Sequence, residues 1–392
     1  MYDPASEIQD YLVFGEFGGV NPSITDSSTF TFMNPDKMSD LFDHDIEGCF
    51  LYSRHWNPIN KYLSGALAKL EGSESAQVTS SGISAICSAI LQVCSQGDEI
   101  ISSRTIYGGT YALFKNVLPK YGIKVHFCDI GNFKEIEGRI GDSTKIIYCE
   151  SISNPLLEVA DIQKLSQIAN QNNLKLFVDN TFSPMFLSPI KLGADVVLHS
   201  MTKFINGASD CVAGCICGTD DFIHELTNIN SGICMLFGPV LDSFRSASIL
   251  KNMHTLHIRI KQHSHNAQYI AEKLDKLGLR VLYPGLTSHP QHELLKSIMN
   301  KGFGFGGMVA IDLVNKEKAE TFMEKMQKEK VGYLAVSLGY YKTLFSQPGH
   351  STSSEIPLDE QKKMGLSEGI VRFSMGLDND IEQTFNRIKK CL

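Results

Sequence analysis

The sequence predicts an α/β fold in which a large, mostly parallel sheet precedes a smaller α+β domain. Between residues 76 and 200, short β-branched runs such as EIISS, KLFVDN and DVVLHS alternate with helical patterns. Runs that are apolar almost throughout are typical of parallel strands buried on both faces. From about residue 255, long helical periodicity and new strand-like runs follow, within LRVLYPG, GGMVAIDLV and GIVRFSMGL. We therefore expect three parts: an extended N-terminal segment over 1–60, an α/β domain over 61–255 and an α+β domain over 256–392.

Length, charge and composition fit this organisation and exclude several classes of protein. A chain of 392 residues exceeds one typical domain, and its 43% apolar content is ample for a packed core. With a net charge of −7 and no basic block, we expect neither nucleic acid nor a membrane surface as a partner. No apolar stretch is long enough to span a bilayer, and the acidic N-terminus lacks a signal pattern, which predicts a cytoplasmic protein. The ten cysteines sit mostly in apolar runs, so we expect buried thiols rather than disulfides or a metal site.

Polar residues follow several predicted strands at the point where each strand ends. The carboxyl ends of parallel strands meet at one edge of a sheet, where ligands bind in such folds. The helix predicted after the first of these points would offer its N-terminal N–H groups to an anion. We therefore expect one ligand site, built from Ser80–Gly82, Glu150–Asn154, Asp179–Thr181 and Ser200–Lys203.

Lys203 follows a strand pattern and has hydroxyl residues three and one positions before it, Ser200 and Thr202. A lysine amine forms a Schiff base with a carbonyl cofactor, and pyridoxal phosphate carries both an aldehyde and a phosphate. Lys203 would hold the aldehyde while the two hydroxyls bind the phosphate. Taken alone the motif is weak, because a solvated lysine after a strand has the same pattern.

The other requirements of pyridoxal phosphate chemistry also have candidates. Asp179 would contact the pyridine nitrogen, Tyr107 would stack on the ring, and Arg372 would bind the substrate carboxylate. Each has an ordinary alternative: a strand-end turn for Asp179, a core position for Tyr107 and a structural ion pair for Arg372. The argument for a cofactor site therefore depends on their occurring together.

Together these motifs resemble those of the PLP-dependent enzymes of cysteine and methionine metabolism, the transsulfuration or cystathionine γ-synthase-like family. The resemblance extends from about Tyr52 to the end of the chain, through YSRHWNP, SSGISAI, YGGTY, ESISNP, VDNTF, HSMTK, AVSLG and VRFSMGL in family order. It implies the aspartate aminotransferase-like architecture of fold type I PLP-dependent transferases, with pyridoxal 5′-phosphate as the cofactor. It also implies a homotetramer, a dimer of dimers whose active sites are shared between subunits.

The resemblance assigns catalytic roles to a few residues. Lys203 matches the cofactor lysine, and Tyr107 matches the stacking tyrosine, which the family also uses as an acid and base near the leaving group. Tyr52 and Arg54 match residues that reach the cofactor phosphate of the neighbouring subunit, and Tyr52 would also help to activate the catalytic amine. The N-terminal segment would therefore contact a neighbouring subunit.

The resemblance assigns binding roles to the other matching positions. Asp179 matches the partner of the pyridine nitrogen, with Thr181 beside it. The phosphate cradle corresponds to Gly82, Ile83, Ser200 and Thr202. The residues that contact the cofactor oxygen or the substrate carboxylate correspond to Asn154, Ser337 and Arg372.

Within the family, the position before Ser337 bears on the substrate. Members that act on cystathionine typically carry glutamate there, whereas Val336 would form an apolar wall suited to an uncharged thioether. We therefore predict a carbon–sulfur lyase that converts L-methionine to α-ketobutyrate, methanethiol and ammonia by α,γ-elimination. Gly109 replaces a cysteine usual in methionine γ-lyases, and Cys234 and Met235 lie near the place of a Lys-Asp pair. Cystathionine γ-lyase or γ-synthase and O-acylhomoserine sulfhydrylase activities therefore remain alternatives.

Overall fold

The computed structural model describes residues 2–32, 34–43, 46, 48–351, 354 and 356–392. Its larger sheet has seven strands, and only β7 runs antiparallel to its neighbours. The prediction of a largely parallel sheet is therefore confirmed. In spatial order the strands are β1 (Ser75–Thr79), β7 (Gly214–Gly218), β6 (Val196–Ser200), β5 (Lys175–Asp179), β4 (Thr144–Glu150), β2 (Glu99–Ser103) and β3 (Lys124–Cys128).

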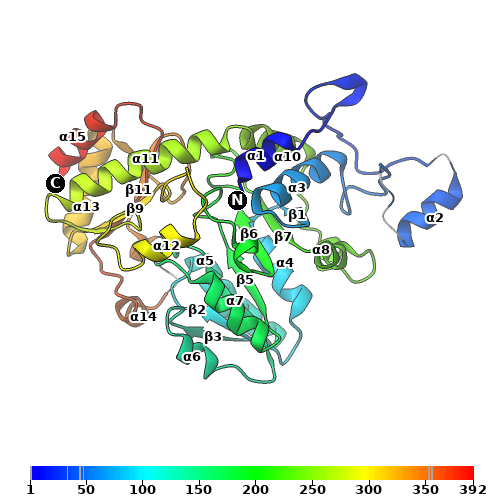
Figure 1. Ribbon diagram of the computed structural model, residues 1–392, viewed down its shortest axis with the longest axis horizontal. Coiled ribbons are helices and arrows are strands. Elements are labelled where there is room, and N and C mark those ends of the chain that lie inside the picture. Colours follow the sequence, from blue (N-terminus) through cyan, green and yellow to red (C-terminus); the bar gives the residue numbers. More distant parts are fainter. Residues whose placement is uncertain (1, 33, 44–45, 47, 352–353, 355) are drawn as a thin grey trace.

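Helices cover both faces of this sheet, and its central strands are buried almost completely (Figure 1). Glu71 at the end of α3 reaches His199 of β6, whereas Gly82 at the start of α4 packs against the next residue, Ser200. Successive strand residues point to opposite faces, so α3 and α4 lie on opposite sides of the sheet. The helices of this part are α3 (Pro58–Glu71), α4 (Gly82–Val93), α5 (Gly108–Ala112), α6 (Phe133–Glu137), α7 (Ile162–Gln171), α8 (Asp220–Thr227), α9 (Ile233–Phe237) and α10 (Ser243–Met253).

The C-terminal part contains a second sheet of five strands with its own hydrophobic cluster. Only the pair β10 and β11 is parallel. The strands, in spatial order, are β10 (Gly332–Leu334), β11 (Thr343–Ser346), β12 (Ile370–Ser374), β9 (Met308–Asp312) and β8 (Arg280–Leu282). The helices are α11 (Leu256–Asp275), α12 (His292–Ile298), α13 (Lys316–Lys328), α14 (Leu358–Lys363) and α15 (Ile381–Cys391). The helix α11 begins at the predicted start of the second domain, although the domain boundaries themselves stay a prediction.

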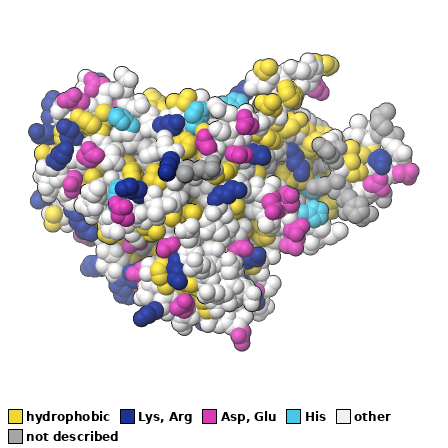
Figure 2. Space-filling view, viewed as in Figure 1, with side chains coloured by type: hydrophobic (Ala, Val, Ile, Leu, Met, Phe, Trp, Pro, Cys, Tyr) yellow, Lys and Arg dark blue, Asp and Glu magenta, His cyan; other side chains and the backbone are white. Residues whose placement is uncertain are grey.

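The N-terminal segment, which we expected to be extended, contains two short helices, α1 (Pro4–Asp10) and α2 (Pro35–Asp43). Figure 1 shows α2 standing away from the body of the molecule. Residues 11–32 form an arm between the helices, on which Phe17 and Val20 are almost fully exposed and Phe14 is more than half exposed. Figure 2 shows hydrophobic side chains gathered on this arm. An apolar arm of this kind is typical of a surface that another protein covers.

The structure also bears on the cysteines and on the search for membrane-spanning segments. In the described part of the chain the ten cysteines are free thiols, and most of them are buried. Among the described residues, no helix combines the length and apolar character needed to cross a bilayer.

Candidate active site

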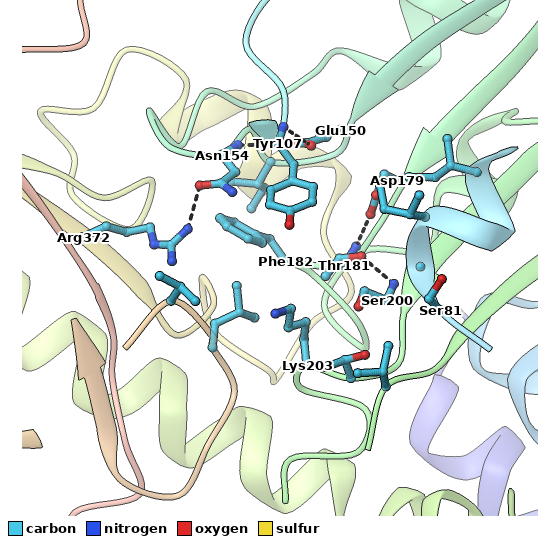
Figure 3. A pocket seen from close by; sticks show the side chains of 18 residues that line it. Ser81, Tyr107, Glu150, Asn154, Asp179, Thr181, Phe182, Ser200, Lys203 and Arg372 are labelled. Atoms are coloured by element: carbon cyan, nitrogen blue, oxygen red, sulfur yellow. Dashed lines mark hydrogen bonds between the residues drawn. The ribbon is translucent and has the colours of Figure 1, made fainter. Parts of the chain in front are cut away.

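The carboxyl ends of β4, β5 and β6 meet at one cavity of about 240 Å³, shown in Figure 3. Glu150, Asp179 and Ser200 are the last residues of these strands, and Arg372 enters the cavity from β12 of the smaller sheet. The cavity is therefore built by both sheets. Of the residues singled out in the sequence, those that line it are Gly82, Ile83, Tyr107, Asn154, Asp179, Thr181, Ser200, Thr202, Lys203, Val336 and Arg372.

Lys203 lies in the turn after β6, and its side chain points into the cavity (Figure 3). Its amine donates a hydrogen bond to the hydroxyl of Ser337 at 3.2 Å. Burial and, to a smaller extent, the positive charge of Arg372 together lower the pKa of the Lys203 amine to about 8. Near neutral pH this amine is therefore neutral far more often than a surface lysine, and the neutral amine is the form that attacks a carbonyl.

Asp179 is half-buried at the end of β5, where its carboxylate accepts a hydrogen bond from the Thr181 backbone N–H at 2.9 Å. Burial raises the pKa of Asp179, and the hydrogen bonds from Thr181 and the positive charge of His199 oppose that rise. Burial acts to lower the pKa of His199, but the 2.6 Å hydrogen bond to Glu71 and the charge of Glu71 together outweigh burial and raise that pKa to about 9. His199 is therefore a buried cation on the strand next to Asp179.

Glu150 lines the cavity beside Asp179, its partner in the register of β4 and β5. Its two carboxylate oxygens accept backbone N–H groups from Tyr107 at 2.7 Å and Asn154 at 2.8 Å. Burial raises the pKa of Glu150 well above its usual value, and the charge of Asp179 adds to this effect. The sequence placed Glu150 at the site edge but assigned it no role, because a strand-end carboxylate has the same pattern as a turn.

The N-terminus of α4 forms one wall of the cavity. Ser81 caps this helix through reciprocal hydrogen bonds with Ser84, and the first helical N–H groups, at Gly82 and Ile83, have no carbonyl partner within the helix. A side chain at Gly82 would place its Cβ 2.8 Å from that of Ser200, so only glycine lets the helix end approach β6 this closely. With the nearby hydroxyls of Ser200 and Thr202, this wall suits an anion.

Arg372 is a buried cation within β12, and it forms no ion pair with any of the residues that the structure describes. Its guanidinium donates hydrogen bonds to the Asn154 Oδ1 at 2.7 Å and to the Ser346 hydroxyl at 3.5 Å. Burial lowers the pKa of Arg372 to about 10, so it stays charged at neutral pH. A buried guanidinium facing a cavity is well suited to bind a carboxylate.

The mouth of the cavity is apolar and open. Tyr107 is 41% exposed, Val336 60% and Val212 62%, and all three line the cavity. This exposure excludes the core alternative for Tyr107. Val212, like Phe182, was missed in the sequence, because an isolated apolar residue carries no signal of a binding role.

Three predicted site residues do not line the cavity of their own chain. Ser337 touches it only through the Lys203 amine. Arg54 donates to the Met235 carbonyl at 3.0 Å and lies 5.8 Å from the ring of Tyr52, which is 41% exposed. The described structure therefore leaves Tyr52 and Arg54 outside the site formed by a single subunit.

The residues of the cavity fit pyridoxal phosphate. A protonated pyridine nitrogen would offset the unfavourable burial of the Asp179 carboxylate, and the start of α4 would hold the phosphate. Lys203 is the amine available for the aldehyde. These are the donor types and charges that the cofactor requires.

Comparison with known proteins agrees with this assignment. The sequence model of the family described as Cys/Met metabolism PLP-dependent enzyme matches residues 11–390. The chain is 43% identical to a methionine gamma-lyase from Arabidopsis thaliana over 99% of this chain and 90% of that protein. It is 34% identical to a cystathionine gamma-lyase from Dictyostelium discoideum over 96% of this chain and 93% of that protein.

Comparison with a solved structure also supports this assignment. A putative O-acetylhomoserine (thiol)-lyase from Campylobacter jejuni, solved with N′-pyridoxyl-lysine-5′-monophosphate, has a TM-score of 0.91 and 27% identity, covering 100% of this chain and 99% of that chain. The predicted fold class, cofactor and enzyme class, a PLP-dependent carbon–sulfur lyase, are confirmed. The chain belongs to the family of Cys/Met metabolism PLP-dependent enzymes.

Proposed function

We propose that the protein catalyses α,γ-elimination on L-methionine, giving α-ketobutyrate, methanethiol and ammonia. The observation that carries the proposal is the combination of a buried guanidinium, Arg372, with an apolar mouth formed by Val212 and Val336. The guanidinium suits the substrate carboxylate, and the valines suit an uncharged thioether because they offer no partner to a distal charge. The similarity to a methionine gamma-lyase from Arabidopsis thaliana supports the same substrate.

Five residues of the cavity have roles in this reaction. Pyridoxal phosphate bound here would supply an aldehyde for the substrate amine and a ring that can accept electrons. Arg372 and Asn154 hold the substrate carboxylate, and Lys203 removes the proton from the α-carbon. Asp179 holds the proton on the pyridine nitrogen. Tyr107, whose hydroxyl faces the cavity in Figure 3, donates a proton to the departing sulfur.

The second candidate is activity on a related substrate at the same residues. Relatives of this chain are named cystathionine gamma-lyase, cystathionine beta-lyase and O-acetylhomoserine (thiol)-lyase, and Gly109 and Cys234 depart from the pattern expected for methionine. These activities share the groups that bind the amine and carboxylate. The substrates differ in the part that would lie at the mouth.

A product assay with L-methionine alone tests the substrate, and Val336→Glu tests the role of the apolar mouth. We expect rapid release of α-ketobutyrate and methanethiol. Glutamate would place an unpaired carboxylate beside the thioether and lower kcat/KM for methionine by about tenfold or more. The relative activity on cystathionine, which carries a distal ammonium group, should rise.

The matched control for this test is Val117→Glu, at a partly exposed valine outside the cavity, which should leave both activities unchanged. Strong activity on cystathionine, or on O-acetylhomoserine with sulfide, but none on methionine would assign one of the related reactions. An unchanged substrate preference in Val336→Glu would remove the argument from the mouth.

We propose further that the active protein is a homotetramer, a dimer of dimers in which Tyr52 and Arg54 complete the site of the neighbouring subunit. Both residues lie outside the cavity of their own chain, and the arm that precedes them exposes Phe14 and Phe17. Arg54 would bind the cofactor phosphate, and Tyr52 would help to activate the catalytic amine. An exposed apolar arm next to such residues is compatible with an interface between copies.

Complementation between Arg54→Ala and Lys203→Ala subunits, at a cofactor concentration too low to saturate Arg54→Ala, tests the shared site. Arg54→Ala should weaken cofactor binding about tenfold to a hundredfold, because hydrogen bonds to charged groups contribute about 1.5–3 kcal/mol. When equal amounts of the two variants exchange subunits at random, about half of the dimers are mixed. One of the two sites in a mixed dimer then combines the Lys203 of one subunit with the Arg54 of the other. About a quarter of wild-type activity should therefore be restored. If confirmed mixed dimers have no more activity than the two parents, each subunit uses its own Arg54.

A further inference from the structure

One face of α11 carries three polar side chains, Arg259, His263 and Asn266. Residues three and four positions apart lie on the same side of a helix, so the three form a stripe. His263 and Asn266 are completely buried. All three contact backbone carbonyls in segments far away in the sequence, and these segments carry the two cationic groups of the cavity.

At one end of the stripe, Arg259 holds the turn that begins at Lys203. Its guanidinium donates to the carbonyls of Phe204 at 2.5 Å and Ile205 at 2.9 Å, and also to that of Asn252 at 3.0 Å. Burial lowers the pKa of Arg259 to about 10, so the group remains a cation with fixed donor directions at neutral pH. The two residues that follow Lys203 are therefore fixed to α11.

The turn itself is shaped for this contact. Gly207 has a φ of +70°, and its N–H donates to the Lys203 carbonyl at 2.8 Å. A Cβ at Gly207 would lie only 2.3 Å from Nη1 of Arg259, so glycine leaves the space that the guanidinium fills. Asn206 continues the network, because its side chain accepts a hydrogen bond from Asn252 at 2.8 Å.

At the other end, the stripe holds the chain immediately after Arg372. The His263 Nδ1 lies 2.6 Å from the Met375 carbonyl, and burial lowers the pKa of His263 to about 4, so the neutral ring donates this bond. Asn266 donates to the carbonyls of Gly376 and Asp378, both at 2.9 Å. The same helix therefore fixes β12 of the smaller sheet and the lysine turn of the larger one.

From this arrangement we infer that α11 sets the spacing between Lys203 and Arg372, with Arg259 as the positioning residue of the lysine and Asn266 as that of the arginine. The inference rests on the proposed function, in which Arg372 binds the substrate carboxylate and Lys203 moves the proton of the adjacent α-carbon. The carboxylate carbon and the α-carbon of the substrate are bonded to each other. A change in the distance between Arg372 and Lys203 therefore disturbs proton transfer directly. A misplacement of about 1 Å costs about a hundredfold in rate.

Two variants separate the two ends of the stripe. Arg259→Lys keeps the charge but loses the forked donor, and should lower kcat by about thirtyfold while KM for L-methionine changes less than about threefold. Asn266→Leu removes the donor near Arg372, and should raise KM by about tenfold with a smaller effect on kcat. Arg280→Lys is the control, at a surface arginine paired with Asp312 at 3.0 Å, and should match the wild type.

Two further readouts do not depend on turnover. In Arg259→Lys, the pH at which the visible band of the lysine-bound cofactor titrates should shift, whereas in Asn266→Leu it should not. In the cofactor-free protein, amide hydrogen exchange over residues 201–208 should be faster in Arg259→Lys than in Arg280→Lys. A merely structural role of Arg259 would lower overall stability without moving the titration of the band.

The inference is overturned if a folded Arg259→Lys variant keeps its kcat and band titration, or if kcat and KM change equally in both variants. Gly207→Ala is a second route to the same question, because its Cβ displaces the guanidinium while the charge is retained. It should reproduce the loss of kcat, and a normal kcat would contradict the inference. A wild-type protein without the visible band would refute the proposed function instead, and hydrogen exchange in the cofactor-free protein would still decide whether Arg259 holds the turn.

Discussion

Lys203→Ala should abolish turnover, with a fall in kcat of at least about 10⁴-fold, as expected when a residue that forms a covalent bond is removed. The visible absorbance of the lysine-bound cofactor should disappear as well, since the Lys203 amine is the group in the cavity placed to take up the aldehyde. Absorbance spectra and a product assay on the purified variant measure both effects.

The control is Lys175→Ala, at the opposite edge of the sheet, where the lysine forms a surface ion pair with Asp195 at 3.0 Å. It should retain the absorbance and nearly all of the activity. A Lys203→Ala protein that keeps an unchanged visible band would show that another amine holds the cofactor, and the assignment of the site would be wrong.

Lys203→Ala should also change the pH dependence of stability in the cofactor-free protein. Burial and Arg372 lower the pKa of the Lys203 amine to about 8 from 10.5, so the unfolded chain binds this proton more tightly than the folded chain does. The free energy of unfolding of the wild type should therefore decrease as the pH falls from about 10 to about 8, by up to about 3 kcal/mol. Denaturant titrations at several pH values should show that the variant lacks this contribution.

Asp179→Asn should reduce activity by about 10²- to 10⁴-fold. The amide has nearly the same shape as the carboxylate but carries no charge to hold a proton on the pyridine nitrogen. Removing one partner of a buried ion pair costs about 3–5 kcal/mol, and about 1.4 kcal/mol corresponds to a factor of ten in rate. The measurements are kcat and the affinity for pyridoxal phosphate.

Stability distinguishes this loss of function from misfolding. Asp179 lies beside the buried carboxylate of Glu150, and its charge raises the pKa of Glu150 and so makes ionisation of Glu150 less favourable. Without cofactor, Asp179→Asn should therefore be at least as stable as the wild type near neutral pH. Asp129→Asn, at an exposed strand-end aspartate paired with Arg104, is the control for activity. Activity of Asp179→Asn within tenfold of the wild type would contradict the proposed role.

The sequence was sufficient to predict where the site lies, because strand ends carry a local signal. Asp179 and Ser200 each end an apolar run, and parallel strands place such residues together at one edge. Arg372 was recognisable because a single cation within a strand pattern is unusual. The register of β12 against β9 and β11, and hence its approach to Asn154, depends on packing between the two sheets and has no local signal.

The supporting residues were not predictable, for different physical reasons. Arg259 lies on a helix with many polar residues, where a charged side chain usually faces solvent, and only the tertiary fold shows that it contacts the lysine turn. Glu150 was indistinguishable from a turn residue until its two backbone donors were seen. The short helices α1 and α2 were missed because segments this short have weak periodicity.

The contrast between the buried strand-end groups and the exposed valines at the mouth has a consequence for how this enzyme can diversify. Arg372 is 3% exposed, and changes there carry the large cost of altering a buried charge. Val212 and Val336 are more than half exposed, and exchanges at such positions usually alter stability by only about 0.5 kcal/mol. Mutations at the mouth can therefore accumulate almost neutrally and redirect a common amino-acid chemistry to new side chains, while the groups that perform it stay unchanged.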